Sequence, residues 1–297
     1  MSREQWVEAL ERPCTDKNSS MFYHISMHNS ISAGILKTAV TAARLAGDII
    51  MKNIGLLSPE DIDTKQASDF VTRVDRWSEA VIMKTVREKF PSHSFLAEET
   101  RRDERSDNYR WIIDPLDGTT NYIHGFPMFS VSIAIEYGDE MMAGVVFDPV
   151  RDELFHAVKG EGAFLNNRRL HVSEIHPPGH SLIATGFPFR KRELTDMYLE
   201  AFKEIFSSVS DIRRAGSAAL DLAYIASGRC DGFFELNLSP WDVASGSLLI
   251  KEAGGVITDF GGGQEFLSTG NVVAGNTNIH GELLDIIKRV FKGVVEC

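Results

Sequence analysis

One segment, Trp111 to Asn121, limits what this chain of 297 residues can fold into more than any other. Its first three residues, Trp-Ile-Ile, are typical of a buried strand, yet Asp114 and Asp117 stand where that strand ends. Burying two carboxylates is costly in free energy unless something cationic lies beside them. We therefore expect a fold in which this strand ends at a site that holds positive charge.

The residues that follow the second carboxylate predict the start of a helix. Asp117-Gly118-Thr119 reads as a first turn, whose backbone N–H groups have no partner within the helix and can bind an anion. Carboxylates suited to a metal and amides suited to a phosphate thus occur in one short segment. This combination indicates metal-assisted chemistry on a phosphate ester.

The charge of the chain fits that chemistry only if metal ions take part. The chain has 31 Lys and Arg against 42 Asp and Glu, which gives a net charge of −11. An acidic balance argues against a general nucleic-acid binder, which needs a basic surface, so we expect no direct nucleic-acid partner. It is equally unfavourable for an anionic substrate, but each bound Mg²⁺ reverses the local sign of the charge.

Several other classes of protein are excluded by the sequence. The three cysteines (Cys14, Cys230 and Cys297) are widely spaced and odd in number, which supports neither a disulfide framework nor a zinc site. No run of 18 apolar residues predicts a membrane span, and residues 1–30 lack the apolar segment of a signal peptide. We expect a cytoplasmic protein without a membrane partner.

The pattern of apolar residues divides the chain into three parts. Residues 1–30 lack periodicity and predict a loose extension. Residues 31–178 predict an N-terminal α+β subdomain, with two helices followed by short strands in a largely antiparallel sheet. Residues 179–297 alternate strands and helices, which predicts a C-terminal α/β subdomain. No linker rich in Pro, Gly or Ser separates the last two parts, so we expect an extensive interface between them.

Two further acidic segments resemble the first in placing carboxylates at the end of an apolar run. One is Phe95-Leu96-Ala97-Glu98-Glu99-Thr100, and the other is Trp241-Asp242-Val243-Ala244-Ser245-Gly246, followed by Glu252-Ala253-Gly254-Gly255. Each of these alone fits a turn or a helix cap. A turn does not, however, need two Asp residues around a Pro, as in Asp114 to Asp117. The three segments together therefore indicate a shared site.

In this order and with these residues, the three segments resemble the motifs of the inositol monophosphatase family. The resemblance covers roughly residues 28–295, and Ala184-Thr-Gly-Phe-Pro-Phe189 is closest to bacterial members. It implies a layered αβαβα sandwich of the sugar-phosphatase type. It also implies Mg²⁺-dependent hydrolysis of small phosphate monoesters, inhibition by Li⁺, and a homodimer.

The same resemblance implies a set of metal ligands. Glu98, Asp114 and the backbone carbonyl of Leu116 would hold one Mg²⁺, and Asp114, Asp117 and Asp242 would hold a second, with Asp114 bridging. Oxygen ligands are those that Mg²⁺ prefers, and it keeps several waters, so a few carboxylates suffice. A third, weaker Mg²⁺ near Glu98 and replacement by Mn²⁺ are also implied.

Catalytic and phosphate-binding roles follow from the resemblance in the same way. The amides of Gly118 and Thr119 would bind phosphate oxygens, while Glu98 and the Thr119 hydroxyl would orient the attacking water. Asp75 would also help to orient that water, although it fits equally well as a cap of the helix it begins.

Contacts with the rest of the substrate are implied further along the chain. Gly216, Ser217, Ala218 and Glu235 would contact the hydroxyl groups of the leaving alcohol, and Asp242 would lie beside them. A carboxylate such as Glu235 is well suited to accept hydrogen bonds from hydroxyls. Arg213 and Arg214 fit either as surface residues or as contacts for a second phosphate.

The motifs define the chemistry more closely than the substrate. The leading hypothesis is hydrolysis of myo-inositol monophosphate. The alternatives are the same chemistry on fructose-1,6-bisphosphate, histidinol phosphate or a 3′-phosphonucleotide, the last disfavoured because no basic pocket is evident in the sequence. The Asp-x-x-Asp spacing argues against a phosphatase of the haloacid dehalogenase type. A non-enzymatic alternative is a regulatory protein that binds the transcription machinery.

Overall fold

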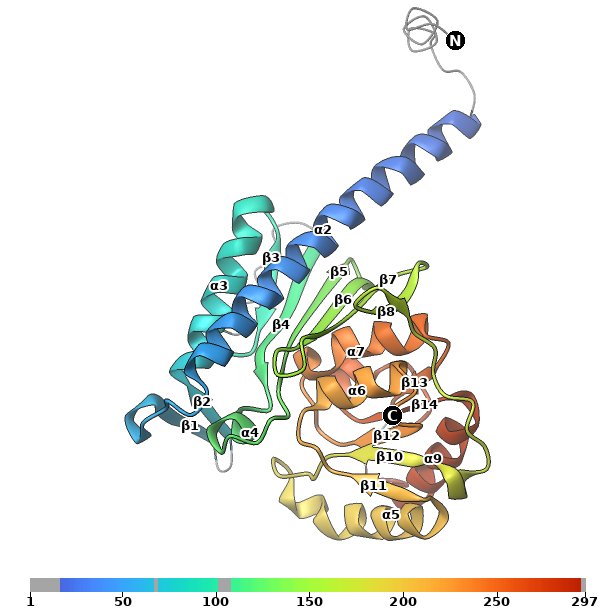
Figure 1. Cartoon of the computed structure of the whole chain (residues 1–297). Coiled ribbons are helices and arrows are strands. Elements are labelled where there is room, and N and C mark those ends of the chain that lie inside the picture. Colours follow the sequence, from blue (N-terminus) through green and yellow to red (C-terminus); the bar gives the residue numbers. More distant parts are fainter. Residues whose placement is uncertain (1–16, 67–68, 101–107, 295–297) are drawn as a thin grey trace, which may run out of the picture. The chain divides into compact units, whose positions relative to one another are not determined.

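The structure, a computed structural model, describes residues 17–66, 69–100 and 108–294 (Figure 1). The chain divides into two compact units, Met1–Ile35 and Leu36–Cys297. Helix α2 (Lys17–Asn53) begins in the first unit, where no Pro or Gly interrupts residues 17–33. Residues 17–30 therefore differ from the loose extension expected of them, and residues 1–16 lie outside the described part of the chain.

A seven-stranded sheet in the larger unit carries the main acidic motif. Its strand order is β3-β4-β5-β6-β7-β8-β9, and every neighbouring pair is antiparallel except β3 and β4. The prediction of a largely antiparallel sheet is therefore confirmed, with one parallel pair that it did not include. The strands are β3 (Ser94–Ala97), β4 (Tyr109–Asp117), β5 (Ser130–Tyr137), β6 (Glu140–Asp148), β7 (Glu153–Val158), β8 (Gly162–Leu165) and β9 (Arg168–Arg169).

A five-stranded sheet follows, in the order β11-β10-β12-β14-β13. Strand β10 pairs in parallel with β11 and β12, and β14 pairs antiparallel with both of its neighbours. Its strands are β10 (Leu182–Thr185), β11 (Asp211–Arg213), β12 (Gly232–Glu235), β13 (Val256–Thr258) and β14 (Val272–Gly275). A separate two-stranded sheet joins β1 (Ile62–Gln66) to β2 (Asp69–Thr72).

Helices and sheets of the larger unit alternate in layers (Figure 1). Helix α3 (Arg73–Lys89) packs on β4, and the part of α2 after Ile35 reaches the same sheet, with Arg44 over the ring of Phe147. Helices α6 (Ala218–Ala226) and α7 (Pro240–Glu252) contact strands of both larger sheets, and α5 (Thr195–Ser208) and α9 (Thr277–Val290) pack against each other beyond the second sheet. The predicted layered α+β fold is therefore confirmed.

The two central helices are apolar because sheets cover them on both sides. Every residue of α6 except Tyr224 is buried, as is α7 from Asp242 to Ile250. Glycines allow the layers to approach closely. A Cβ on Gly246 of α7 would lie 2.5 Å from the Leu222 Cβ of α6, and one on Gly144 of β6 would lie 2.9 Å from a backbone oxygen of α7.

Short elements complete the unit. They are α4 (Thr119–Ile123), α8 (Phe266–Thr269) and the 3₁₀ turns η1 (Pro59–Asp61), η2 (Pro178–His180) and η3 (Arg192–Leu194). The first large sheet ends at Arg169 and the second begins at Leu182, on either side of the predicted boundary at residues 178 and 179. Both sheets belong to one compact unit, so the division into subdomains stays a prediction. Within the described ranges, no helix combines the length and apolar character needed to cross a bilayer.

Candidate functional site

Three aspartates from two distant parts of the chain meet at one point. Asp114 and Asp117 come from the end of β4, and Asp242 comes from the first turn of α7. One carboxylate oxygen of each lies within 4.8 Å of the others, and all three residues are buried. Carboxylates so close together repel one another in a low-dielectric interior. The arrangement is therefore suited to hold a cation.

The pKa of each carboxyl in this cluster is raised, chiefly by burial. Burial and the surrounding carboxylates raise the pKa of Asp114 well above its usual value. The pKa of Asp117 rises to about 6 and that of Asp242 to about 7, again through burial first. The positive charge that these groups need must come from protons or from a metal ion. Because the donors are carboxylate oxygens without His or Cys, the set fits Mg²⁺ rather than Zn²⁺.

An irregularity in strand pairing brings Asp114 and Asp117 to the same place. Side chains three residues apart on a regular strand point to opposite faces of the sheet. Here Asp114 pairs with Ser132 and Asp117 with Ser130, so three steps on β4 match two on β5. The amide of Leu116 donates to Oδ1 of Asp114 at 3.0 Å and closes the turn around the intervening proline. The bulge therefore brings both carboxylates to the same place, where they can bind a cation together.

Glu98 reaches the same cavity through the one parallel strand pair. Ala97 at the end of β3 lies opposite Ile113 of β4, and the amide of Glu98 donates to the Ile113 carbonyl at 3.1 Å. Because the two strands end together, Glu98 and Asp114 follow at the same edge of the sheet. The side chain of Glu98 is buried and lines the cavity, beside the closer group of three aspartates.

Two of the clustered carboxylates also begin helices. Oδ2 of Asp117 accepts hydrogen bonds from the Ser217 hydroxyl at 2.5 Å and from the Ala219 amide at 2.9 Å, at the start of α6. Oδ2 of Asp242 accepts the amide of Ser239 at 2.8 Å in the capping box of α7. Ser217, predicted as a substrate contact, therefore directs its hydroxyl to Asp117.

The predicted phosphate turn requires glycine at its first position. Gly118 precedes α4 with φ of 93°, and a Cβ there would lie 2.8 Å from the carbonyl oxygen of Met128. The Asn121 amide then ties this turn to its neighbours, donating to the carbonyl oxygens of Met128 at 2.7 Å and Ala215 at 2.9 Å. Asn121 is the last residue of the acidic motif, but its hydrogen bond to Ala215 joins residues that are 94 positions apart in the sequence.

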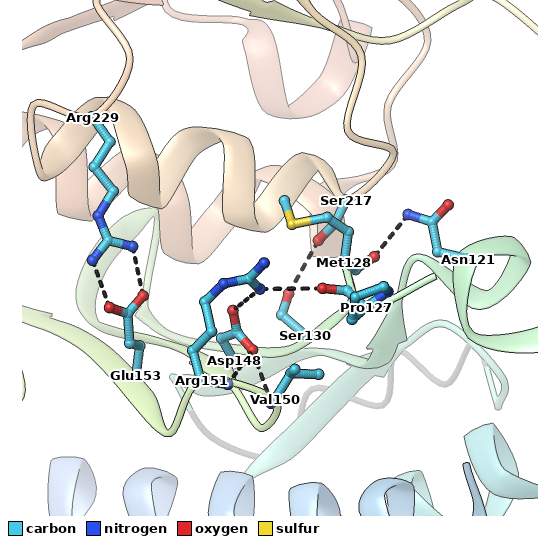
Figure 2. A network of polar contacts seen from close by, with 10 residues as sticks. All are labelled: Asn121, Pro127, Met128, Ser130, Asp148, Val150, Arg151, Glu153, Ser217 and Arg229. Carbon is cyan, nitrogen blue, oxygen red and sulfur yellow. Dashed lines mark hydrogen bonds and ion pairs between the residues drawn. The ribbon is translucent and has the colours of Figure 1, made fainter. Parts of the chain in front are cut away.

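The segment after α4 is held by the end of β6 and by the turn between β6 and β7 (Figure 2). Arg151 donates from Nη1 to the Pro127 carbonyl at 3.1 Å and to Oδ2 of Asp148 at 2.8 Å. The other oxygen of Asp148 accepts the amides of Val150 and Arg151. Together with the Asn121 bond to Met128, these contacts hold the backbone that leads from the turn into β5.

Asp75 caps α3, one of the two roles that the sequence allowed for it, and also contacts Thr119. It is the third residue of α3, and its Oδ2 accepts the Thr72 amide at 2.8 Å and the Thr72 hydroxyl at 2.6 Å. Its Oδ1 accepts the Thr119 hydroxyl at 2.9 Å. The same hydroxyl lies 3.0 Å from the Leu116 carbonyl, the predicted backbone metal ligand. Burial raises the pKa of Asp75 to about 6.

A cavity of about 340 Å³ joins these groups to the predicted leaving-group contacts. Gly216, Ser217, Ala218 and Glu235 line it together with Glu98 and the three clustered aspartates. Burial, followed by the charge of Asp242, raises the pKa of Glu235 to about 8. Glu235 packs so closely on Gly186 that a Cβ there would lie 2.0 Å from its Oε1.

Two arginines in this cavity correct the expectation that the site lacks a basic region. Arg190 and Arg214 both line it. Nη1 of Arg190 lies 3.9 Å from Oδ2 of Asp242 and contributes positive charge beside the cluster. Arg190 directly follows the Ala184–Phe189 segment in the sequence, a signal that could have identified it. Arg214, which the sequence allowed as a surface residue or as a contact for a second phosphate, lies between β11 and α6.

Comparison with known proteins gives one matching family and a set of curated relatives. The model of the inositol monophosphatase family matches residues 33–291. The Nus factor SuhB of Escherichia coli (strain K12) is 46% identical over 264 residues, which cover 86% of this chain and 99% of the relative. The Nus factor SuhB of Pseudomonas aeruginosa is 47% identical over 259 residues, which cover 86% of this chain and 96% of the relative.

Solved structures agree with these relatives. The extragenic suppressor protein suhB from Bartonella henselae superposes with a TM-score of 0.83 at 41% identity, covering 88% of this chain and all 100% of that one. An inositol monophosphatase from Anabaena (Nostoc) sp. PCC 7120 superposes with a TM-score of 0.78 at 38% identity, covering 86% and 96% of the two chains.

Proposed function

This chain belongs to the inositol monophosphatase family, and on that premise we propose that it is a Mg²⁺-dependent hydrolase of small phosphate monoesters. The observation that carries the proposal is the convergence of Asp114, Asp117 and Asp242 beside the turn at Gly118 and Thr119. Carboxylates that need a cation and amides that can bind a phosphate oxygen border the same cavity. This pairing supports phosphoryl chemistry, in which positioning and electrostatics supply most of the rate enhancement.

The residues present fit the metal that the family implies. Glu98, Asp114 and the Leu116 carbonyl would hold one Mg²⁺, and Asp114, Asp117 and Asp242 a second. When bound, such ions polarise the phosphoryl oxygens, lower the pKa of a coordinated water and stabilise the leaving oxygen. A carbonyl oxygen has two lone pairs, so the contact of the Leu116 carbonyl with Thr119 leaves it able to bind a cation.

Thr119 and Asp75 would prepare the attacking water. Because the Thr119 hydroxyl donates its hydrogen to Asp75, its oxygen can accept a hydrogen bond from a water in the cavity. The carboxylate of Asp75 fixes the hydroxyl in that orientation, and Glu98 can accept the second hydrogen of the water. The amides of Gly118 and Thr119 would bind the phosphate oxygens and so hold the phosphoryl group beside that water.

The other end of the substrate would contact Gly216, Ser217, Ala218 and Glu235. A polyol leaving group offers hydroxyls to a carboxyl and to backbone groups, and the cavity of about 340 Å³ suits a small ring. We propose myo-inositol monophosphate as the substrate, which is supported by the name of the Anabaena structure, an inositol monophosphatase. Fructose-1,6-bisphosphate, histidinol phosphate and 3′-phosphonucleotides are the alternatives. Inhibition by Li⁺, replacement of Mg²⁺ by Mn²⁺, a homodimer and a cytoplasmic location belong to the same proposal.

A substrate panel tests this function. Purified protein with Mg²⁺ is expected to release phosphate from myo-inositol 1-phosphate faster than from p-nitrophenyl phosphate, and to lose that activity in EDTA. Equal turnover of both esters would remove the inositol assignment and leave the metal-dependent phosphatase. Activity that persists in EDTA would remove the metal-dependent mechanism itself.

A second candidate function is regulation through binding to the transcription machinery. It is favoured by the names of the relatives in Escherichia coli and Pseudomonas aeruginosa, each a Nus factor SuhB at 46% or 47% identity. An Asp242→Asn variant separates the two functions, because Asn can keep the capping bond to Ser239 while removing the charge. If a strain with this variant keeps the growth phenotype of the wild type, binding is the required function. If the phenotype is lost while the variant protein remains folded, catalysis is required.

A further inference from the structure

Gly186 and Glu235 meet at the predicted leaving-group end of the cavity, which both residues line. Strands β10 and β12 run parallel with Thr185 opposite Phe234, so the residues that follow them, Gly186 and Glu235, also lie next to each other. A Cβ on Gly186 would overlap both oxygens of the Glu235 carboxylate and the carbon between them. The carboxylate therefore occupies the space that any other residue at position 186 would fill with its own side chain.

The backbone of Gly186 does not itself require glycine. Its φ lies outside the left-handed region that favours glycine, whereas Gly118 and Gly216 of the same cavity both have positive φ. Alanine can therefore adopt the conformation of Gly186 without backbone strain. The three atoms nearest to a Cβ there all belong to Glu235. What glycine provides at this position is room for one carboxylate.

The end of β10 is held in place one residue before Gly186. The Thr185 hydroxyl donates to the Phe234 carbonyl at 2.7 Å and lies 2.9 Å from the Tyr198 hydroxyl. Thr185, Phe234 and Tyr198 are all buried, so these contacts join β10 to β12 and to α5 inside the core. A side chain at position 186 would therefore displace the Glu235 carboxylate rather than the backbone. The open space beside that carboxylate is the cavity of about 340 Å³.

We infer that Gly186 is a positioning residue that sets the size of the leaving alcohol, because it lets Glu235 lie back against the end of β10 and leaves room for a ring-shaped polyol. The Glu235 carboxylate would accept hydrogen bonds from that alcohol, so its place decides how much of the cavity the alcohol can use. This inference rests on the proposed function, because it concerns the alcohol part of the same substrate. Since Gly186 acts through Glu235, its substitution should spare the metal ligands and the turn at Gly118.

The test compares two phosphate monoesters whose alcohols differ in size. They are myo-inositol 1-phosphate, with a ring alcohol, and glycerol 2-phosphate, with a short open-chain alcohol. Gly186→Ala is expected to lower the ratio of kcat/KM for the inositol ester to that for the glycerol ester by about tenfold or more, the usual effect of one added carbon in a pocket that fits its ligand. The loss should fall mainly on KM for the inositol ester, because the phosphate contacts are kept.

A second substitution at Glu235 separates positioning from a general loss of structure. Glu235→Asp shortens the side chain by one methylene group and withdraws the carboxylate from Gly186. In that background Gly186→Ala should change the ratio little, which is the coupling expected of two residues in contact. A loss of the ratio that is equal with Glu and with Asp at position 235 would overturn the inference, as would an equal loss of kcat/KM for both esters.

Gly232→Ala is the matched control. Gly232 also lacks a positive φ, but a Cβ there would lie 2.7 Å from the side chains of Ile279 and Leu283 in the core, rather than against a residue of the cavity. It is expected to lower the urea midpoint of unfolding and to keep the wild-type ratio of the two esters. A control that lowers the ratio as much as Gly186→Ala would show that any crowding near β12 has this effect, which overturns the inference.

Folding and hydrolysis are checked separately. If Gly186→Ala does not fold, Glu235→Asp should restore its folding; a double variant that also fails to fold overturns the inference, because the glycine would then be needed by the fold. If the wild type hydrolyses neither ester, the proposed function fails and calorimetric binding of the same two esters with Mg²⁺ decides. A loss of affinity in Gly186→Ala that is confined to the inositol ester supports the inference, and equal losses, or no binding of either ester by the wild type, overturn it.

Discussion

The Thr119 hydroxyl lies 2.9 Å from Oδ1 of Asp75 and links the first turn of α4 to the first turn of α3. The other oxygen of Asp75 accepts both the amide and the hydroxyl of Thr72, so the carboxylate cannot rotate without giving up a helix cap. The hydroxyl that would orient the attacking water is therefore held by a group that is itself fixed in place. Such preorganisation avoids the cost of ordering these groups during the reaction.

Removing this hydroxyl should slow catalysis with little effect on folding. Thr119→Ala is expected to lower kcat by about 10²- to 10⁴-fold, the usual contribution of a positioned proton-transfer group. Thr119→Ser keeps the hydroxyl and should stay within about tenfold of the wild-type kcat. The measurement is phosphate release at saturating Mg²⁺ and substrate. An alanine variant as active as the serine variant would show that the Thr119 hydroxyl does not orient the attacking water.

The Asp114→Asn substitution should have opposite effects on activity and on the stability of the metal-free protein. Asparagine keeps an oxygen for the Leu116 amide but cannot serve as a charged ligand, so kcat should fall by several orders of magnitude. In EDTA the same variant should melt at a higher temperature than the wild type, because one buried carboxyl with a raised pKa is gone.

Thermal melting with and without Mg²⁺ measures this directly. Asp139→Asn, in the exposed turn between β5 and β6, is the control and should match the wild type in both assays. A wild-type chain that melts above Asp114→Asn in EDTA would mean that the cluster is stable without a cation, which contradicts the assignment of a metal site.

The stability of the metal-free protein should depend on pH in a defined direction. The folded-state pKa of Asp242 is raised from 3.8 to about 7, so the folded state binds more protons than the unfolded state between these values. The contribution of Asp242 is therefore most favourable at low pH and is lost as the pH rises toward 7. Asp117, raised to about 6, acts in the same direction.

Histidines titrate in the same range, so the informative quantity is a difference between variants. Urea denaturation in EDTA from pH 5 to pH 8 should show the free energy of unfolding of the wild type falling relative to that of Asp242→Asn. Saturating Mg²⁺ should cancel or reverse this difference, because the ion replaces the protons. A difference that does not change with pH would contradict the raised pKa.

The turn at Gly118 should tolerate no side chain. Gly118→Ala combines a positive φ of 93° with a Cβ only 2.8 Å from the Met128 carbonyl oxygen. Gly138→Ala is the control, because it has φ of 64° but open space around the new Cβ. We expect a loss of about 1 kcal/mol in the control from backbone strain alone, and about 3 kcal/mol or more at Gly118. Urea denaturation measures both, and equal losses would show that the clash is relieved by movement of the loop.

Much of the site could be predicted because its signals are local. An apolar run that ends in Asp114 and Asp117 marks both a strand and a costly burial of charge, and the following glycine marks a turn. The alternation of helices with strands after residue 179 was also evident, since α6 and the buried part of α7 are rich in apolar residues. The metal-ligand roles came from the family resemblance and stay predictions, but the structure does bring Asp114, Asp117 and Asp242 together.

The remaining features depend on contacts between distant residues. The bulge between Asp114 and Asp117 is defined by the pairing of β4 with β5, so no local sequence pattern predicts it. Ser217 lines the cavity and donates its hydroxyl hydrogen to Asp117 across 100 positions, a contact that a single motif could not show. The short strands β8 and β11 are defined by their pairing rather than by their composition, so no local pattern predicts them. The start of α2 was not predicted, because residues 17–30 lack the periodicity of an amphipathic helix.

Several buried carboxylates of this molecule also stabilise the fold, independently of any reaction. Asp75 and Asp242 complete capping boxes, and Asp117 accepts the first amides of a central helix. In a lineage that gave up hydrolysis and kept only a role as a binding partner, selection for folding alone would preserve these residues. Such a descendant would keep these residues for folding. An intact acidic motif would therefore not show that a protein is an active enzyme.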